Sequence, residues 1–170
     1  MGCSGRSAAK DEVIVTMPTT SEPEAGFDPA YGWGAGEHVH EPLIQSTLTV
    51  TNTDLSIGMD LATDYSVSED GLTWTVKIRD DVKFTDGEPL TAEDVAFTYN
   101  NCRDNSSVND FSMLKEAVAV DDTTVEFHMN TPFAVWPYTM QSLELFRNMR
   151  MMKLRTESNR FRTLYYETVG

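Results

Sequence analysis

The segment from Leu72 to Val95 constrains the fold more than any other part of this 170-residue chain. It reads LTWTVKIRDDVKFTDGEPLTAEDV, and its first half alternates between apolar and polar residues. Trp74, Val76 and Ile78 fall on one face of an extended strand, and the polar residues between them fall on the other face. This spacing predicts a strand with one buried face, in which Trp74 belongs to the core.

The second half of the same segment predicts a turn followed by a helix. Residues 82–84 resume the extended pattern, and Asp86-Gly87 is typical of a turn because glycine accepts a positive φ. Thr91 is a suitable helix N-cap, and the acidic residues after it suit the positive end of the helix dipole. We therefore expect the order strand, turn, strand, turn and helix.

The residue identities in this segment point to a known family. Written as W-x-V-x-I-R-x-x-V-x-F-x-D-G-x-P-L-T-A-x-D-V, the segment resembles the signature region of bacterial extracellular solute-binding proteins of family 5. These are the solute-binding proteins of ABC importers for oligopeptides, dipeptides and nickel. The resemblance extends upstream through Ser68-Glu69-Asp70-Gly71 and His40-Glu41-Pro42-Leu43, and it covers residues 12–140.

The resemblance implies a fold class and an incomplete domain. Family members have two lobes that close on a ligand, and they are much longer than 170 residues. We therefore expect an α/β fold of the mixed α+β kind, corresponding to the N-terminal part of lobe I of a two-lobed fold like that of periplasmic binding proteins. The expected division is a tether at 1–11, a partial lobe I at 12–140, and a tail at 141–170 that does not resemble the family.

Several further elements are expected along the chain. Val13–Val15 predicts a core strand, and residues 39–51 predict a helix end and a strand with Leu48 and Val50 directed inward. The helix after Thr91 should continue to Cys102. A short helix is expected at 111–117, and a hairpin is expected over 118–129 with its turn at Asp121-Asp122.

The tail differs from the rest of the chain in charge. Residues 1–140 contain 7 Lys and Arg against 24 Asp and Glu, whereas residues 141–170 contain 6 against 3. Back-translation of Gln141–Gly170 in other reading frames, with permitted codons, yields strings that resemble what the family carries next. We interpret the tail as derived from a frameshift and poorly ordered. The alternative is a genuine basic amphipathic helix that binds a partner or a membrane surface.

The N-terminus resembles a bacterial lipoprotein processing site. Gly2-Cys3-Ser4 is followed by a polar stretch, and no apolar run of a signal peptide precedes Cys3. On this interpretation Cys3 carries a lipid, and the protein lies outside the cytoplasm as a cell-surface lipoprotein or in the periplasm. The alternative is an incidental thiol.

The candidate ligand-binding residues are Tyr31, Trp33, His38 and His40. Aromatic side chains offer apolar area with a polar edge, which suits a pocket that closes on varied small molecules. His38 and His40 could provide soft nitrogen ligands, but two residues apart they align only on an extended segment. We therefore assign no metal site and no cofactor.

The remaining chemistry-bearing residues have structural interpretations. We expect Arg79 to form a structural salt bridge and Cys102 to be a buried, small, apolar residue. The pairs Asp80-Asp81 and Asp121-Asp122 suggest acid–base catalysis only weakly, because adjacent acids in turns are usually solvated. No nucleophile motif accompanies them, so we do not expect an enzyme.

These observations favour a binding protein that captures oligopeptides or dipeptides and delivers them to an ABC transporter permease. The alternatives are a nickel or metal-chelate binding protein of the same family and a structural surface lipoprotein. The net charge of −14 argues against nucleic acid and against anionic membrane surfaces as partners. We therefore expect contact with the membrane only through a lipid anchor. We expect a monomer, and a fragment of this length with little solute affinity of its own.

Overall fold

The computed structural model describes residues 46–84, 86–106, 109–143 and 145. The expected strand at 13–15 lies outside these residues. The described elements, in chain order, are β1 (Thr49–Thr51), β2 (Ile57–Met59), β3 (Ala62–Val67), β4 (Thr73–Ile78), α1 (Ala92–Asn105), β5 (Leu114–Asp121), β6 (Thr124–Met129), α2 (Trp136–Thr139) and the 3₁₀ helix η2 (Met140–Ser142). This combination confirms the expected mixed α/β class.

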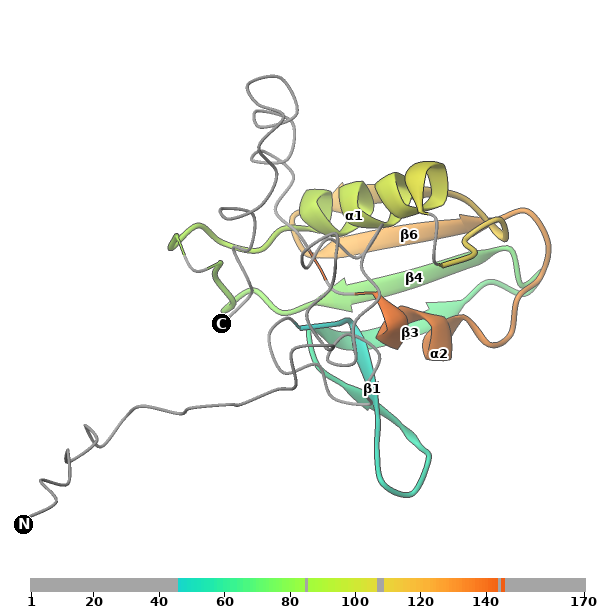
Figure 1. Cartoon of the computed structure of the whole chain (residues 1–170), viewed down its shortest axis with the longest axis horizontal. Coiled ribbons are helices and arrows are strands. Elements are labelled where there is room, and N and C mark those ends of the chain that lie inside the picture. The colour runs from blue at the N-terminus through green and yellow to red at the C-terminus, as the bar shows by residue number, and fades with distance from the viewer. Residues whose placement is uncertain (1–45, 85, 107–108, 144, 146–170) are drawn as a thin grey trace, which may run out of the picture.

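An antiparallel four-stranded sheet with the order β3-β4-β6-β5 forms the centre of the described structure. Helix α1 lies across one face of it, above β5 and β6 (Figure 1). The predicted alternation of β4 is confirmed, because Trp74, Val76 and Ile78 are all buried on the face that carries the core. The corresponding residues of β6 are Val125, Phe127 and Met129, which are also buried. A separate two-stranded ribbon, β1-β2, lies beside the sheet.

Four aromatic rings join α1 to the sheet and to α2. The Tyr99 ring of α1 lies 4.8 Å from that of Phe127 on β6 and 5.6 Å from that of Trp136 on α2, measured between ring centroids. Phe111 completes the group, with its centroid 5.9 Å from that of Tyr99. The Tyr99 hydroxyl donates a hydrogen bond to the carbonyl oxygen of Met140 at 3.2 Å. Large aromatic surfaces are therefore removed from water where three elements meet.

Helix α1 begins where the sequence predicted, with Thr91 as its N-cap. The Asp94 carboxylate accepts a hydrogen bond from the Thr91 backbone N–H at 2.9 Å and another from the Thr91 hydroxyl at 2.7 Å. This is one half of a capping box, and it satisfies a backbone donor that the helix itself cannot pair. The helix continues to Asn105, three residues beyond the expected end.

The expected short helix at 111–117 is wrong. Residues from Leu114 onward belong to β5, where Ala117 pairs with Phe127 of β6, and a turn at 112–113 precedes them. Burial alternates only at some positions, because register shifts lie near both ends of the strand. The expected hairpin is confirmed, although its turn lies at Asp122-Thr123, one residue later than predicted.

Two smaller expectations need adjustment. Leu48 is buried as predicted, but Val50 is only half-buried because β1 forms part of a short ribbon instead of the main sheet. Residues 82–84 do not continue as a strand. Lys83 forms an isolated bridge with Pro89, and Gly87 between them has a φ of +91°, as the turn prediction required.

The capping contact at Thr91 gives a testable prediction. Asp94→Ala removes the acceptor of the Thr91 N–H and should lower the free energy of unfolding by about 1 kcal/mol. Glu93→Ala is the matched control, because Glu93 is exposed in the same first turn and carries the same charge. Urea denaturation of both variants measures the difference. Equal losses for the two variants would mean that the helix dipole, and not the capping contact, stabilises this end.

Candidate functional site

The predicted ligand-binding residues Tyr31, Trp33, His38 and His40 lie outside the described residues, and so does Cys3. Their roles stay predictions. The described residues nearest to them along the chain are those that start at Ser46, only six positions after His40. The contacts of the residues that start at Ser46 therefore bear on the candidate site, because the chain leads from the candidate residues directly into them.

Residues 46–51 comprise β1 and the three residues before it, and they contact the last described residues of the chain. We call this region the β1 junction. The Thr49 hydroxyl donates to the carbonyl oxygen of Pro137 at 2.7 Å, and the Leu145 N–H donates to the carbonyl oxygen of Ser46 at 3.2 Å. The Thr51 hydroxyl bonds to the side chain of Gln141. The junction therefore ties the exit of the candidate segment to α2 and η2.

The centre of the junction, residues 47–49, is buried. Thr47 and Thr49 are fully buried, and each has hydrogen-bond partners, as buried polar groups require. The Thr47 N–H donates to Asp60 Oδ2 at 3.1 Å, and its hydroxyl donates to the carbonyl oxygen of Thr49 at 2.7 Å. Four apolar residues pack in the same core and are also fully buried: Leu48, Met140, Leu143 and Leu145. The centre of the junction is therefore packed firmly into the core of the described structure.

The described residues of the predicted tail take part in this packing. Gln141, Ser142, Leu143 and Leu145 are described, and both leucines are fully buried. The other residues of the tail lie outside the described part of the chain. The frameshift interpretation of 141–170 thus stays a prediction, although its first few residues form part of the core.

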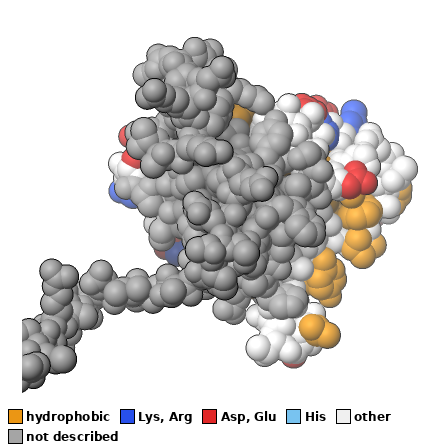
Figure 2. Space-filling model, in the orientation of Figure 1, with side chains coloured by type: hydrophobic (Ala, Val, Ile, Leu, Met, Phe, Trp, Pro, Cys, Tyr) orange, Lys and Arg blue, Asp and Glu red, His pale blue; other side chains and the backbone are white. Residues whose placement is uncertain are grey.

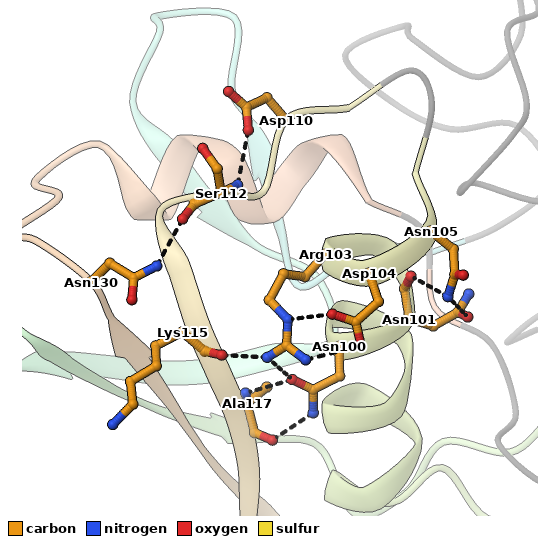
Figure 3. A network of polar contacts seen from close by, with 10 residues as sticks. All are labelled: Asn100, Asn101, Arg103, Asp104, Asn105, Asp110, Ser112, Lys115, Ala117 and Asn130. Atoms are coloured by element: carbon orange, nitrogen blue, oxygen red, sulfur yellow. Dashed lines mark hydrogen bonds and ion pairs between the residues drawn. The ribbon is translucent and has the colours of Figure 1, made fainter.

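A second concentration of polar side chains links α1 to β5 (Figure 3). β5 is an edge strand of the sheet, and the Asn100 carboxamide occupies the place of a further strand beside Ala117. Its Nδ2 donates to the Ala117 carbonyl oxygen at 2.8 Å, and its Oδ1 accepts from the Ala117 N–H at 2.9 Å. Helix α1 in this way closes part of an edge that would otherwise be open to strand pairing.

Arg103 extends the same network through four hydrogen bonds of its guanidinium. It donates to the Asp104 carboxylate through Nε at 2.7 Å and through Nη2 at 3.0 Å, and to Asn100 Oδ1 through Nη1 at 3.1 Å. Nη1 also bonds to the carbonyl oxygen of Lys115. These hydrogen bonds hold the pKa of Asp104 below its usual value and raise the pKa of Arg103. Four of the five guanidinium N–H groups are used by protein acceptors, so we interpret the network as structural.

The face of the sheet opposite α1 carries a polar group that the sequence analysis did not single out. His128 Nδ1 lies 3.3 Å from the Thr73 hydroxyl oxygen, and His128 Nε2 lies 3.4 Å from Glu126 Oε2. Thr73 and His128 are directly opposed across β4 and β6, which is the arrangement of ordinary cross-strand pairs. The sequence offered no signal for this group, because the register of β4 against β6 is not readable from either strand alone.

The described residues offer no metal centre, since no group of three or more His, Cys, Asp and Glu among them could hold an ion. Of the helices in these same ranges, none has the length and apolar character to cross a membrane. Asp80, Asp81, Asp121 and Asp122 are exposed, as expected for solvated turn residues.

Three structural assignments made from the sequence are confirmed. Trp74 is a core residue that is 6% exposed, and Cys102 is a buried thiol that is 1% exposed. Arg79 forms an ion pair with Asp81 at 2.8 Å, and both side chains are largely exposed. An exposed pair of this kind contributes little to stability.

The Asn100 contact gives a second prediction. Asn100→Ala leaves both backbone groups of Ala117 without their partners and should lower the free energy of unfolding by roughly 1–3 kcal/mol. The control is Asn130→Ala, because Asn130 is exposed and its side chain donates to the carbonyl oxygen of Ser112, a bond that the substitution removes without affecting Ala117. Urea unfolding measures stability, and hydrogen exchange of the Ala117 amide measures the local effect. Unchanged exchange at Ala117 would contradict the role given to Asn100.

Comparison with known proteins places these features in a wider group. The family described as "Bacterial extracellular solute-binding proteins, family 5 Middle" matches residues 56–159, a range that continues past Met140. The glutathione-binding protein GsiB of Pectobacterium atrosepticum is 32% identical over 136 residues, which cover 76% of this chain and 25% of that protein. The nickel-binding periplasmic protein of Escherichia coli is 37% identical over 101 residues, covering 58% of this chain and 18% of that protein.

Solved structures agree with the sequence comparison. NikZ from Campylobacter jejuni, in complex with Ni(L-His), has a TM-score of 0.64 at 25% identity and covers 82% of this chain and 27% of its own. The oligopeptide-binding protein AppA from Bacillus subtilis, in complex with a nonapeptide, has a TM-score of 0.56 at 27% identity and covers 68% of this chain and 23% of its own. The chain thus spans between 18% and 27% of the length of these relatives.

Proposed function

The chain belongs to the bacterial extracellular solute-binding proteins of family 5, and we propose that it is part of an extracytoplasmic component that captures oligopeptides or dipeptides for an ABC importer. The observation that carries this proposal is the family match over residues 56–159, which includes the whole of the β4 to α1 signature. The peptide-bound relatives of similar fold support the choice of substrate class.

If the protein captures peptides, each candidate residue has an expected role. The six-residue step from His40 to Ser46 spans at most about 21 Å, so the β1 junction limits how far the candidate segment can lie from the core. Tyr31 and Trp33 would supply apolar contact area to a peptide, and His38 or His40 would contact its polar groups. Cys3 would anchor the protein to the membrane through a lipid, and the partner in transport would be the permease.

A nickel complex is the second candidate solute. It is favoured by the likeness to NikZ, which was solved with Ni(L-His), and to the nickel-binding protein of E. coli. Imidazole nitrogen is a common ligand for Ni²⁺, and His38 and His40 are the available candidates in the predicted site. Their i, i+2 spacing permits joint ligation only on an extended segment, so a nickel–ligand complex suits them better than a bare ion.

We propose that the 170-residue chain on its own binds these solutes poorly, because a cleft between two lobes needs both lobes. Isothermal titration calorimetry of this chain with dipeptides, a nonapeptide and Ni(II)-histidine should show no binding at micromolar concentration. The same titrations of a chain extended to the length of its relatives should show peptide binding, reduced by Trp33→Ala and unchanged by Tyr138→Phe. Micromolar binding by the short chain would contradict the proposal, and heat with Ni(II)-histidine alone would favour the nickel alternative.

The tail carries its own prediction. If residues 141–170 derive from a frameshift, the nucleotide sequence should encode family-like residues in the two other frames, with the switch at a run of adenines near Lys153. Sequencing of the genomic region in all three frames measures this. Codons that are incompatible with such family-like residues would support a genuine basic segment instead.

A further inference from the structure

The β1-β2 ribbon projects from the body of the protein (Figure 1). The loop that joins its strands contains an exposed leucine. Residues 52–56 connect its two strands, and Leu55 at this end is 71% exposed. Its φ of +67° makes it the one residue other than glycine with a positive φ in the described part of the chain. An aliphatic side chain and a left-handed backbone thus coincide in the loop at the end of the ribbon.

Both properties are unfavourable for the isolated protein. A left-handed backbone brings the leucine Cβ close to the following carbonyl oxygen, whereas glycine or asparagine would accept the same φ more easily. An exposed leucine also gains nothing from burial. Such departures from local preference concentrate at functional positions, where another interaction compensates for them.

The connection is held rigidly in this conformation. The Asn52 N–H donates to the Ser56 carbonyl oxygen, and the Leu55 N–H donates to the Asn52 carbonyl oxygen, both at 2.9 Å. Asp54 Oδ1 accepts from the Ser56 N–H at 3.0 Å and from its hydroxyl at 2.6 Å. A Cβ at Gly58 would lie 2.8 Å from Asn52 Oδ1, so glycine at this position leaves room for the Asn52 side chain. Leu55 is therefore presented in a fixed direction, which lowers the entropy lost on binding.

Three other exposed apolar residues come from the ribbon and from α2 with its N-cap, and together with Leu55 we call them the hairpin surface: Leu55, Met59, Val135 and Tyr138. The last three are 44%, 51% and 45% exposed. Met59 is the cross-strand partner of Thr49, and Thr49 bonds to Pro137 of α2, so the ribbon and α2 are neighbours. Figure 2 shows hydrophobic side chains over α2 and at the end of the ribbon on the same side of the molecule.

Charge limits what can cover this surface. The described residues contain 17 Asp and Glu against 5 Lys and Arg. Hydrogen bonds from Ser56 hold the pKa of Asp54 below its usual value, so a carboxylate stands beside Leu55 at neutral pH. A second copy of this chain or an anionic lipid surface would meet like charge. A partner with an apolar pocket bordered by Lys or Arg is complementary.

We propose that the hairpin surface is a docking site for the extracytoplasmic side of the permease, with Leu55 inserted into an apolar pocket whose rim carries Lys or Arg. This proposal rests on the proposed function, because only a transport component has a permease as its partner. It names the surface and the chemistry by which the two proteins meet. Leu55 is the central contact, and Asp54 pairs with the basic rim.

The first test locates the contact by photo-cross-linking of the full chain in cells of the source organism. Leu55→p-benzoylphenylalanine should cross-link to the membrane-embedded subunit of the importer, identified by mass spectrometry. Val120→p-benzoylphenylalanine is the control, because Val120 is a similarly exposed aliphatic residue, 56% exposed, on β5. Cross-links to a second copy of the chain, to lipid alone, or to nothing beyond the Val120 control would overturn the proposal.

The second test measures affinity with the identified permease in lipid nanodiscs. Leu55→Gly should weaken binding about tenfold or more while leaving the thermal midpoint equal or higher, because glycine accepts the positive φ. Asp54→Asn should weaken binding less and reduce its salt dependence, and Val120→Thr should leave it within about twofold. Unchanged affinity of Leu55→Gly would overturn the proposal. Solute titration of the extended chain is independent of both tests. The docking proposal can therefore fail while the titration shows solute binding, and docking can be observed while the titration shows none.

Discussion

The packing of Tyr99 against Phe127 and Trp136 is the contact on which the rest of the described structure depends. It joins the helix, the central strand β6 and the segment that follows the sheet. Trp136 is fully buried, so the short helix α2 is fixed in place although four residues alone would not form a stable helix. The position of α2 then determines the β1 junction, because Pro137 accepts the hydrogen bond of Thr49.

Much of this fold was predictable from local patterns. The alternation of Trp74, Val76 and Ile78 survives in the structure because the sheet has one apolar and one polar face, so periodicity and burial coincide. The start of α1 was predictable from Thr91, because its capping contact with Asp94 is made within four residues. The error at 111–117 arose because Lys115 and Glu116 favour a helix by composition, whereas pairing with β6 decided the strand.

The candidate site was less accessible to sequence reasoning. Tyr31, Trp33, His38 and His40 were chosen by side-chain chemistry and resemblance, and no contact among described residues tests them. The β1 junction could not be foreseen either, because Thr49 and Pro137 are far apart in the sequence and their contact depends on how α2 packs. The His128 group shows the same limit, since its partner Thr73 lies on another strand. Local patterns identify elements, and long-range register places their side chains together.

The strand order also has a consequence for how the protein folds. β4 pairs with β3 on one side, which is a local hairpin, but on its other side it pairs with β6, which follows only after α1 and β5. The entropy of closing that long connection must be lost before the central pair gains any contacts. During synthesis, β4 has no second neighbour until the chain has been made as far as Met129. The β3-β4 hairpin can therefore form early, whereas the complete sheet can close only after α1 and β5 have been made, so the edge of β4 stays open to other partners in the interval.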